Sequence, residues 1–200
     1  MRATITKAEL YEKYYSVYPD KARLYLGDTQ MPNHCHNRVT FYPSGNNTDS
    51  SLDQIETLKD IFTGESVFSH IIPEPDWANT PLMSSDQSRY GTDRGKLGEL
   101  PQYVDGFGGK MLRFQSTGQQ DDRWYDWRRK YWSVKWDVCD VEVDYQKAGN
   151  LVHLTFLTPW GPPEGIYERL CEMGYEFLMW EWQDECEEEV HDLVPLEVVA

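Results

Sequence analysis

The stretch that most constrains the fold is a strand-like alternation from Val138 to Tyr145. Its apolar side chains and its acidic side chains occupy alternate positions: Cys139, Val141, Val143 and Tyr145 against Asp140, Glu142 and Asp144. A period of two predicts a strand with one packed face and one wet, acidic face. The turn residues Lys147–Asn150 follow, and Leu151–Thr158 is predicted to be the returning strand. The chain therefore contains an antiparallel hairpin that packs on one side.

The apolar spacing elsewhere predicts two helices and two more strands. Val39 and Phe41 alternate with polar neighbours, whereas the apolar residues from Leu52 to Phe62 recur at helical spacing. The full predicted order is strand 37–43, helix 51–62, strand 138–145, strand 151–158, helix 163–173 and strand 175–183. This is the βαββαβ order of a ferredoxin-like α+β domain, in which strands 37–43 and 151–158 are central.

Three regions are predicted along the chain. Residues 1–30 form an N-terminal helical extension, residues 31–183 form the ferredoxin-like domain, and residues 184–200 form an acidic C-terminal tail. The domain carries a long insertion, 63–137, in which Val67–Ile72 reads as a short strand and the following Pro- and Gly-rich residues read as turns and loops. An ordered connection of this length indicates a function or a partner.

The insertion ends in a tryptophan-rich stretch, Asp121–Asp137, with the sequence DDRWYDWRRKYWSVKWD. A helix over 121–132 places Trp124, Trp127 and Tyr131 on one face as an apolar stripe, with Arg128 and Trp132 beside it. One interpretation is a helix that packs this stripe against the uncovered face of the sheet, as the N-terminal helix also does, and keeps Arg123, Arg129 and Lys130 in solvent. The other is an exposed surface that stacks nucleic-acid bases or a partner's side chains.

A second aromatic grouping is expected near the end of this stretch. If the helix packs as described, Lys135 and Trp136 lie close to Trp160, which is itself predicted to be buried under the helix 163–173 at the turn TPWGPP. We interpret the five tryptophans as a structural or binding aromatic cluster: Trp124, Trp127, Trp132, Trp136 and Trp160.

The charge of the chain is strongly negative, with a net value of −15 and a pI near 4.6. Affinity for nucleic acid depends largely on neutralising phosphates, so this balance argues against a phosphate-binding protein and favours a basic partner. No Lys or Arg follows Arg169, and the acidic residues culminate in the run Asp184–Glu189. Such a run is either a solvated, self-repelling tail or a docking surface for a basic protein, in the extreme a mimic of the phosphate backbone.

Signatures of catalysis, metal binding or membrane insertion are weak. The four cysteines form no CxxC pair, and no run of eighteen apolar residues occurs, so we expect free thiols, no membrane segment and a bacterial cytoplasmic setting. His34 and His36 point the same way on a strand but lack an evident third metal ligand. The acids Asp140, Glu142 and Asp144 read as the wet face of a strand rather than as catalytic carboxylates. We expect no cofactor, and an enzyme is the less favoured class.

Three motifs resemble a known family. The segments MPNHCHNRVTF from Met31, Trp124–Trp136 and LTFLTPWGPPEGIYERL from Leu154 resemble, in this order, motifs of the YubB ferredoxin-like family of small phage and plasmid proteins. Ser133 and Val134 stand where that family usually has Gly and Thr. The resemblance covers about residues 31–183 and implies a ferredoxin-like fold and a mobile-element origin. It implies no reaction, because the family has no established activity and fold alone does not decide function.

The leading hypothesis is a non-enzymatic, host-modulating phage or plasmid accessory protein that binds a host protein with a basic surface. Its expected contact residues are Asp184, Glu185, Glu187, Glu188 and Glu189, together with the aromatic residues or the insertion. The alternative is RNA or single-stranded DNA binding on the open sheet face, through Phe41, Tyr42, Phe156, Arg123, Arg128, Arg129, Lys130 and Lys135. A metal-assisted enzyme that uses His34 and His36 is a third, less favoured hypothesis. The sequence predicts no oligomeric state.

Overall fold

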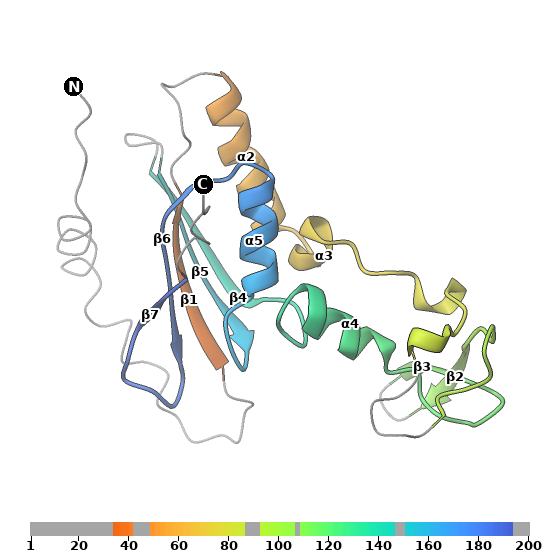
Figure 1. Ribbon diagram of the computed structural model, residues 1–200. Coiled ribbons are helices and arrows are strands. Elements are labelled where there is room, and N and C mark those ends of the chain that lie inside the picture. The colour runs from red at the N-terminus through yellow and green to blue at the C-terminus, as the bar shows by residue number, and fades with distance from the viewer. Residues whose placement is uncertain (1–33, 42–48, 87–92, 107–108, 147–150, 194–200) are drawn as a thin grey trace, which may run out of the picture. The chain divides into compact units, whose positions relative to one another are not determined.

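The computed structural model describes residues 34–41, 49–86, 93–106, 109–146 and 151–193 (Figure 1). The predicted extension 1–30, Tyr42, the turn 147–150 and residues 194–200 lie outside the described residues. The helices are α2 Asp49–Thr63, α3 Val67–Ile71, α4 Arg123–Tyr131 and α5 Glu164–Glu172, with short 3-10 turns at Trp77–Asn79 and Ser84–Asp86. The strands are β1 His34–Phe41, β2 Gln102–Gly106, β3 Gly109–Arg113, β4 Cys139–Gln146, β5 Leu151–Pro159, β6 Phe177–Asp184 and β7 His191–Asp192.

The main sheet is antiparallel and has five strands in the order β4-β5-β1-β6-β7. Its register is fixed through β1, where Val39 is opposite Leu154 of β5 on one side and Trp180 of β6 on the other. The predicted α+β class is confirmed, and the first and third predicted strands are interior strands, as expected. The two-residue strand β7, within the predicted acidic tail, was not predicted.

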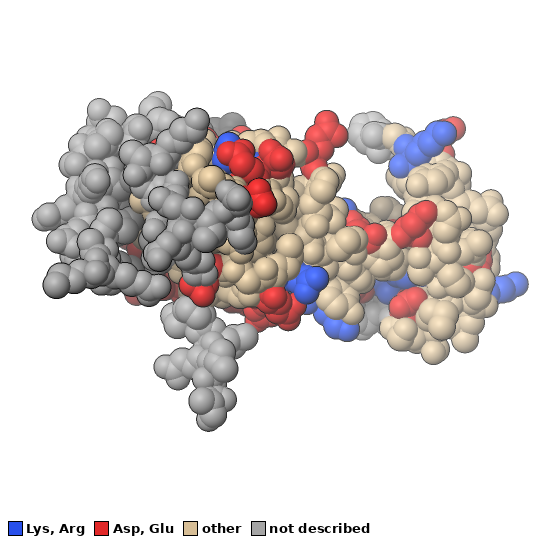
Figure 2. All heavy atoms as spheres, turned by 90° about the horizontal axis from the view of Figure 1, so that it is seen from above, with Lys and Arg blue, Asp and Glu red and all other residues tan. Residues whose placement is uncertain are grey.

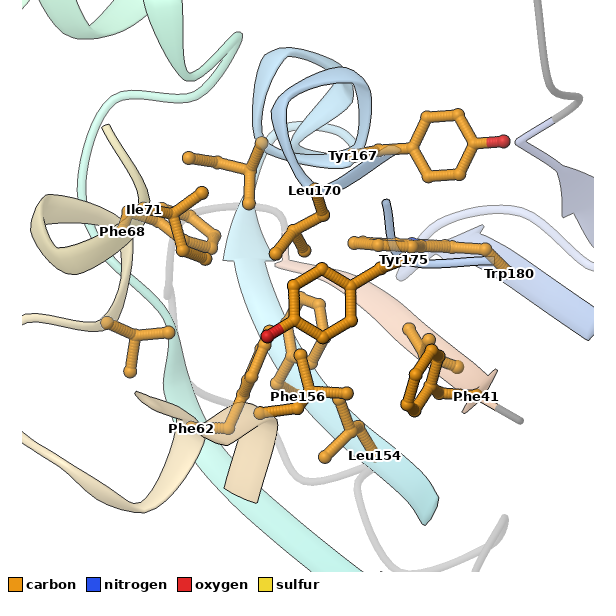
Figure 3. Close-up of a cluster of buried hydrophobic side chains, with 14 of the residues drawn as sticks. Phe41, Phe62, Phe68, Ile71, Leu154, Phe156, Tyr167, Leu170, Tyr175 and Trp180 are labelled. Atoms are coloured by element: carbon orange, nitrogen blue, oxygen red, sulfur yellow. The ribbon is translucent and has the colours of Figure 1, made fainter. Parts of the chain in front are cut away.

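Helices α2 and α5 lie on the same face of this sheet (Figure 1). Directly opposed residues of antiparallel strands share a face, so Phe41 of β1 and Phe156 of β5 point toward these helices with Val39, Leu154 and Trp180. There they join Ile55, Leu58, Ile166 and Leu170 in one core. Figure 3 shows Phe41, Leu154, Phe156, Leu170 and Trp180 in this core. Phe41 and Phe156 are buried in this core, which corrects the expectation that they lie on an open sheet face.

The segment Val67–Ile71 is a helix, α3, and not the strand predicted from its apolar run. A short apolar run fits either state, and here the burial of Val67, Phe68 and Ile71 follows the spacing of a helix turn. The residue before it, Ser66, has a left-handed backbone with φ of 56°, which starts the helix after the turn that ends α2. Further along the insertion, residues predicted to be turns and loops form the antiparallel strands β2 and β3.

Two buried arginines hold the insertion together. The Arg94 guanidinium donates to Asp122 Oδ1 and to Asp126 Oδ2, both at 2.6 Å. Arg123 donates to both carboxylate oxygens of Asp121, at 2.9 and 2.8 Å, and lies over the rings of Trp77 and Phe114. With an exposed fraction of 3%, Arg123 belongs to the core of the insertion, which corrects its placement in solvent.

The tryptophan-rich helix α4 packs differently from the predicted stripe. Trp132, at its C-terminal end, is the buried tryptophan of this stretch, and it belongs to the same core as α2, α3 and α5. Trp127 packs against this core from its edge, while Tyr131 is 40% exposed. The helix therefore extends the helical layer and does not cover the opposite face of the sheet.

The four cysteines are free, and their environments predict different reactivities. Burial raises the pKa of the Cys35 thiol to about 12, whereas Cys186 and Cys171 are exposed. Burial also raises the pKa of the Cys171 thiol. The thiolate is the form that reacts with alkylating agents, so iodoacetamide at about pH 8 is expected to modify Cys186 first and Cys171 more slowly in the native protein, and to spare Cys35. Peptide mass mapping before and after denaturation measures this, and equal labelling of Cys35 and Cys186 in the native state would contradict the buried position.

Candidate partner-binding end of the sheet

Three segments far apart in the sequence meet at one end of the main sheet. His34 begins β1, and Pro159 at the end of β5 is its partner on one side. On the other side the backbone N–H of Glu185 donates to His34 O at 2.9 Å, and the N–H of His34 donates to Glu185 Oε2 at 3.0 Å. Neighbouring strands are about 4.8 Å apart, so Glu185 and Pro159 flank His34 at a separation of roughly 10 Å.

The acidic run 184–189, termed the acidic loop, connects β6 to β7 at this end. Its first turn is held by Asp184, whose carboxylate accepts the N–H of Cys186 at 2.9 Å. After the loop, His191 of β7 stacks on Trp182 with 4.4 Å between ring centroids and contacts Glu187 Oε2 at 3.2 Å. The four glutamates of the loop are exposed. The described part of the predicted tail is thus an ordered connection, because β7 pairs with β6.

On the other side of His34 lies an aromatic joint made of Lys135, Trp136 and Trp160. The Trp136 and Trp160 ring centroids are 6.1 Å apart, and Lys135 Nζ lies 5.0 Å from each of them and 5.7 Å from the Tyr125 ring. The predicted proximity of these three residues is confirmed. The contact of Tyr125 with Lys135 was not predicted, because the place of Tyr125 on α4 relative to Lys135 depends on the turn between them.

The prediction that Trp160 is buried is wrong, since 45% of this residue is exposed. Its backbone has a left-handed φ of 62°, which turns the chain away from the end of β5. A second left-handed turn lies at Ser133, with a φ of 67°, and the N–H of Gly165 in the first turn of α5 donates to Ser133 Oγ at 3.2 Å, which ties this turn to the start of α5. Gly165 also passes so close to Tyr131 that an added Cβ would lie 2.1 Å from its carbonyl oxygen.

The strain at Trp160 indicates a role other than packing. A bulky residue with positive φ is an outlier, and such conformations cost about 1–3 kcal/mol and concentrate at functional sites. Burial of the indole in the core would offset that cost, but almost half of this residue faces solvent. The turn therefore presents an aromatic ring at the surface, at the same end of the sheet as the acidic loop.

Replacing Trp160 with glycine is expected to change the free energy of unfolding by less than about 1 kcal/mol. Glycine adopts positive φ without strain, and this gain offsets the lost contact between the Trp160 and Trp136 rings. Urea denaturation of the two proteins measures the difference. A loss of more than about 3 kcal/mol in the free energy of unfolding would show that the ring stabilises the fold. The strained backbone would then not indicate a role in binding.

The residues expected to bind nucleic acid are dispersed by the fold. Arg128 lies between the rings of Trp124 and Trp132 and donates to Glu74 Oε2 at 2.9 and 2.6 Å, so its charge is already compensated. Arg123 is buried with Asp121. Arg129 and Lys130 are exposed on α4, and Lys135 belongs to the aromatic joint. The predicted basic surface therefore loses two of its five cations to internal ion pairs.

The candidates for metal chemistry are not brought together. Among the described residues, no group of three His, Cys, Asp or Glu side chains is placed to hold a metal ion, His34 and His36 included. The alternation of β4 is interrupted by a bulge between Cys139 and Glu142, where Asp140 has a φ of 51°. No described helix is long and apolar enough to span a membrane.

Acidic side chains are spread over the face of the molecule seen in Figure 2 rather than gathered in one patch. On this face charge alone therefore does not select a binding site, whereas the exposed, strained indole at the same end of the sheet as the acidic loop does. Searches of protein-family models, of curated proteins and of solved structures find no match to the chain.

Proposed function

We propose that the protein is a non-enzymatic binding protein that engages a partner protein with a basic surface through the acidic loop and the aromatic joint. One observation carries the proposal: the exposed, strained Trp160 and the four exposed glutamates lie on either side of His34 at the same end of the sheet. A central aromatic anchor with a charged rim is the arrangement in which a few residues supply most of the binding energy.

The two parts of this surface have separate tasks. Acidic side chains attract a basic partner at a distance and accelerate its encounter, an effect that salt weakens. The indole of Trp160 loses its contact with water when the partner covers it, which slows dissociation. The net charge of −15 acts in the same direction as the loop.

The finer description of the fold is also a proposal. We infer that the sheet with α2 and α5 is a ferredoxin-like domain of the YubB type, from a mobile genetic element. The order β4-β5-β1-β6 of the four main strands, with α2 and α5 on one face, supports the fold, and the three sequence motifs support the family. The bacterial cytoplasm follows from the same proposal as the place where the partner is met.

An affinity capture from bacterial lysate tests the proposed function. The tagged protein is compared with an acidic-loop variant, in which Glu185, Glu187, Glu188 and Glu189 are changed to glutamine, with and without nuclease treatment. A matched control changes four exposed glutamates elsewhere to glutamine: Glu56, Glu168, Glu172 and Glu176. The proposal expects a stoichiometric protein that resists nuclease, is kept by the control and is lost by the loop variant.

Two results would reject the proposal. Equal loss in the loop variant and the control would show that only total charge matters. Capture that nuclease abolishes would instead favour the alternative, RNA or single-stranded DNA stacked on the exposed Trp160 beside Lys135.

A further inference from the structure

Strand β4 is the outer strand of the main sheet on the side away from β7. Among the described residues it pairs with β5 alone, so one side of its backbone carries N–H and C=O groups that the sheet does not pair. An extended peptide that adds to such an edge gains main-chain hydrogen bonds, and adjacent hollows supply specificity for its side chains.

A groove of about 670 Å³ runs beside this strand, between β4 and the turn that joins α2 to α3. Part of its lining is apolar and comes from the partly covered core edge, including Val141 and Val143 of β4. Acidic side chains line it as well: Glu65 from the turn, and Asp137 and Asp140 from the start of the strand. The groove therefore combines apolar contact surface with negative charge at a sheet edge.

We propose that β4 and this groove bind an extended, basic peptide segment of a partner protein as an added strand. Its side chains on the groove face contact Val141 and Val143 and reach Glu65 and Asp140, and its basic side chains on the other face meet the exposed Asp144. The site is on the opposite edge of the sheet from β7, and the proposal does not rest on binding at the acidic loop.

Charge selects a basic partner over a second copy of the chain. In a pair of β4 strands related by two-fold symmetry, the exposed acids Asp140 and Asp144 of one copy would come close to the same acids of the other. Like charges directly opposed across strands are unfavourable. A segment with alternating Lys or Arg and apolar residues reverses the sign of each of these contacts.

The test uses an eight-residue probe peptide of alternating lysine and valine, and a counterpart in which every backbone nitrogen is methylated. The counterpart keeps the charges and side chains but has no backbone N–H donors, so it cannot pair as a strand. Binding to the full chain is measured by calorimetry, and hydrogen exchange of the β4 amides locates it. We expect protection in β4 and at least about tenfold weaker binding of the methylated peptide, since it loses several hydrogen bonds.

A groove variant carries Glu65→Gln, Asp140→Asn and Asp144→Asn. Asparagine tolerates the left-handed backbone at position 140. Its control carries the same exchanges on exposed positions of α2 and α5: Glu168→Gln, Asp53→Asn and Asp60→Asn. Each exposed ion pair contributes a factor of about two, so the groove variant is expected to bind the peptide roughly eightfold more weakly than the control.

Three results would overturn this inference. Equal affinity of the two peptides would show that the peptide binds through its charge alone and not as an added strand. Protection confined to residues 185–193 would place the peptide on the acidic loop. Protection of β4 that rises with protein concentration in the absence of peptide would show that a second copy occupies the edge. A failed lysate capture leaves these outcomes unaffected, so the two proposals are tested separately.

Discussion

Replacing Arg123 with alanine is expected to lower the free energy of unfolding by about 4 kcal/mol. The substitution leaves the Asp121 carboxylate, which is 3% exposed, without the cation that compensates it. It also removes the donors to Pro81 O at 3.1 Å and Thr80 O at 2.8 Å, and it empties the space between the Trp77 and Phe114 rings. Urea denaturation of the variant and the parent measures the effect.

Two further variants sharpen this test. Arg123→Lys is expected to recover little stability, because an ammonium cannot reproduce the planar, multidentate contacts of the guanidinium. Arg129→Ala, on the exposed side of the same helix, is expected to stay within about 0.5 kcal/mol of the parent. Similar losses of stability for Arg123→Ala and Arg129→Ala would contradict the buried position of Arg123 and its contacts within the insertion.

Replacing Trp132 with alanine is expected to cost about 4 kcal/mol, the usual loss for a large aromatic side chain in a core. Trp132 is 1% exposed, its ring meets Phe68 edge-on at 5.7 Å, and its Nε1 donates to Ile72 O at 3.1 Å. The change opens a cavity and leaves that carbonyl without its donor. Calorimetric unfolding or urea denaturation measures the loss.

The matched control is Trp124→Ala on the same helix. Trp124 contributes to a groove of about 480 Å³ rather than to the core, so its loss is expected to stay below about 2 kcal/mol. A larger loss of unfolding free energy for Trp124→Ala than for Trp132→Ala would contradict the described packing. It would indicate that the helix packs through the predicted stripe of Trp124, Trp127 and Tyr131.

The strands and helices of the main domain were predictable because one face of each is apolar. Alternation at Val39 and Phe41 and helical spacing at Ile55 and Leu58 identify the elements that form the core. The helical conformation of α3 was not predictable, because its short apolar run fits a helix and a strand equally well. The strand β7 has no apolar pattern at all, and its place depends on pairing with β6.

The packing of the tryptophan-rich helix could not be predicted from the sequence. Aromatic residues occur around most of its circumference, so spacing does not identify the buried one, and Trp132 is selected by its contact with α3. Arg123 has the sequence context of a solvent-exposed cation. Its burial depends on carbonyl oxygens near residue 80, more than forty residues earlier in the chain. Long-range partners of this kind leave no local signal.

The candidate site was predictable in its parts but not in its assembly. The acidic run and the Lys135, Trp136 and Trp160 grouping were both identified from sequence. Their meeting on either side of His34 follows from strand register, and the exposure of Trp160 follows from a left-handed turn. Sequence spacing determines neither of these features.

The most direct measurement is the association and dissociation rate of the captured partner with four proteins: the parent, the acidic-loop variant, the four-glutamate control and Trp160→Gly. The proposed function predicts that the loop variant slows association, most strongly at low salt, and that Trp160→Gly accelerates dissociation by about tenfold or more. The control is predicted to change association less than the loop variant does. Unchanged rates in both the loop variant and Trp160→Gly would contradict binding at this end of the sheet.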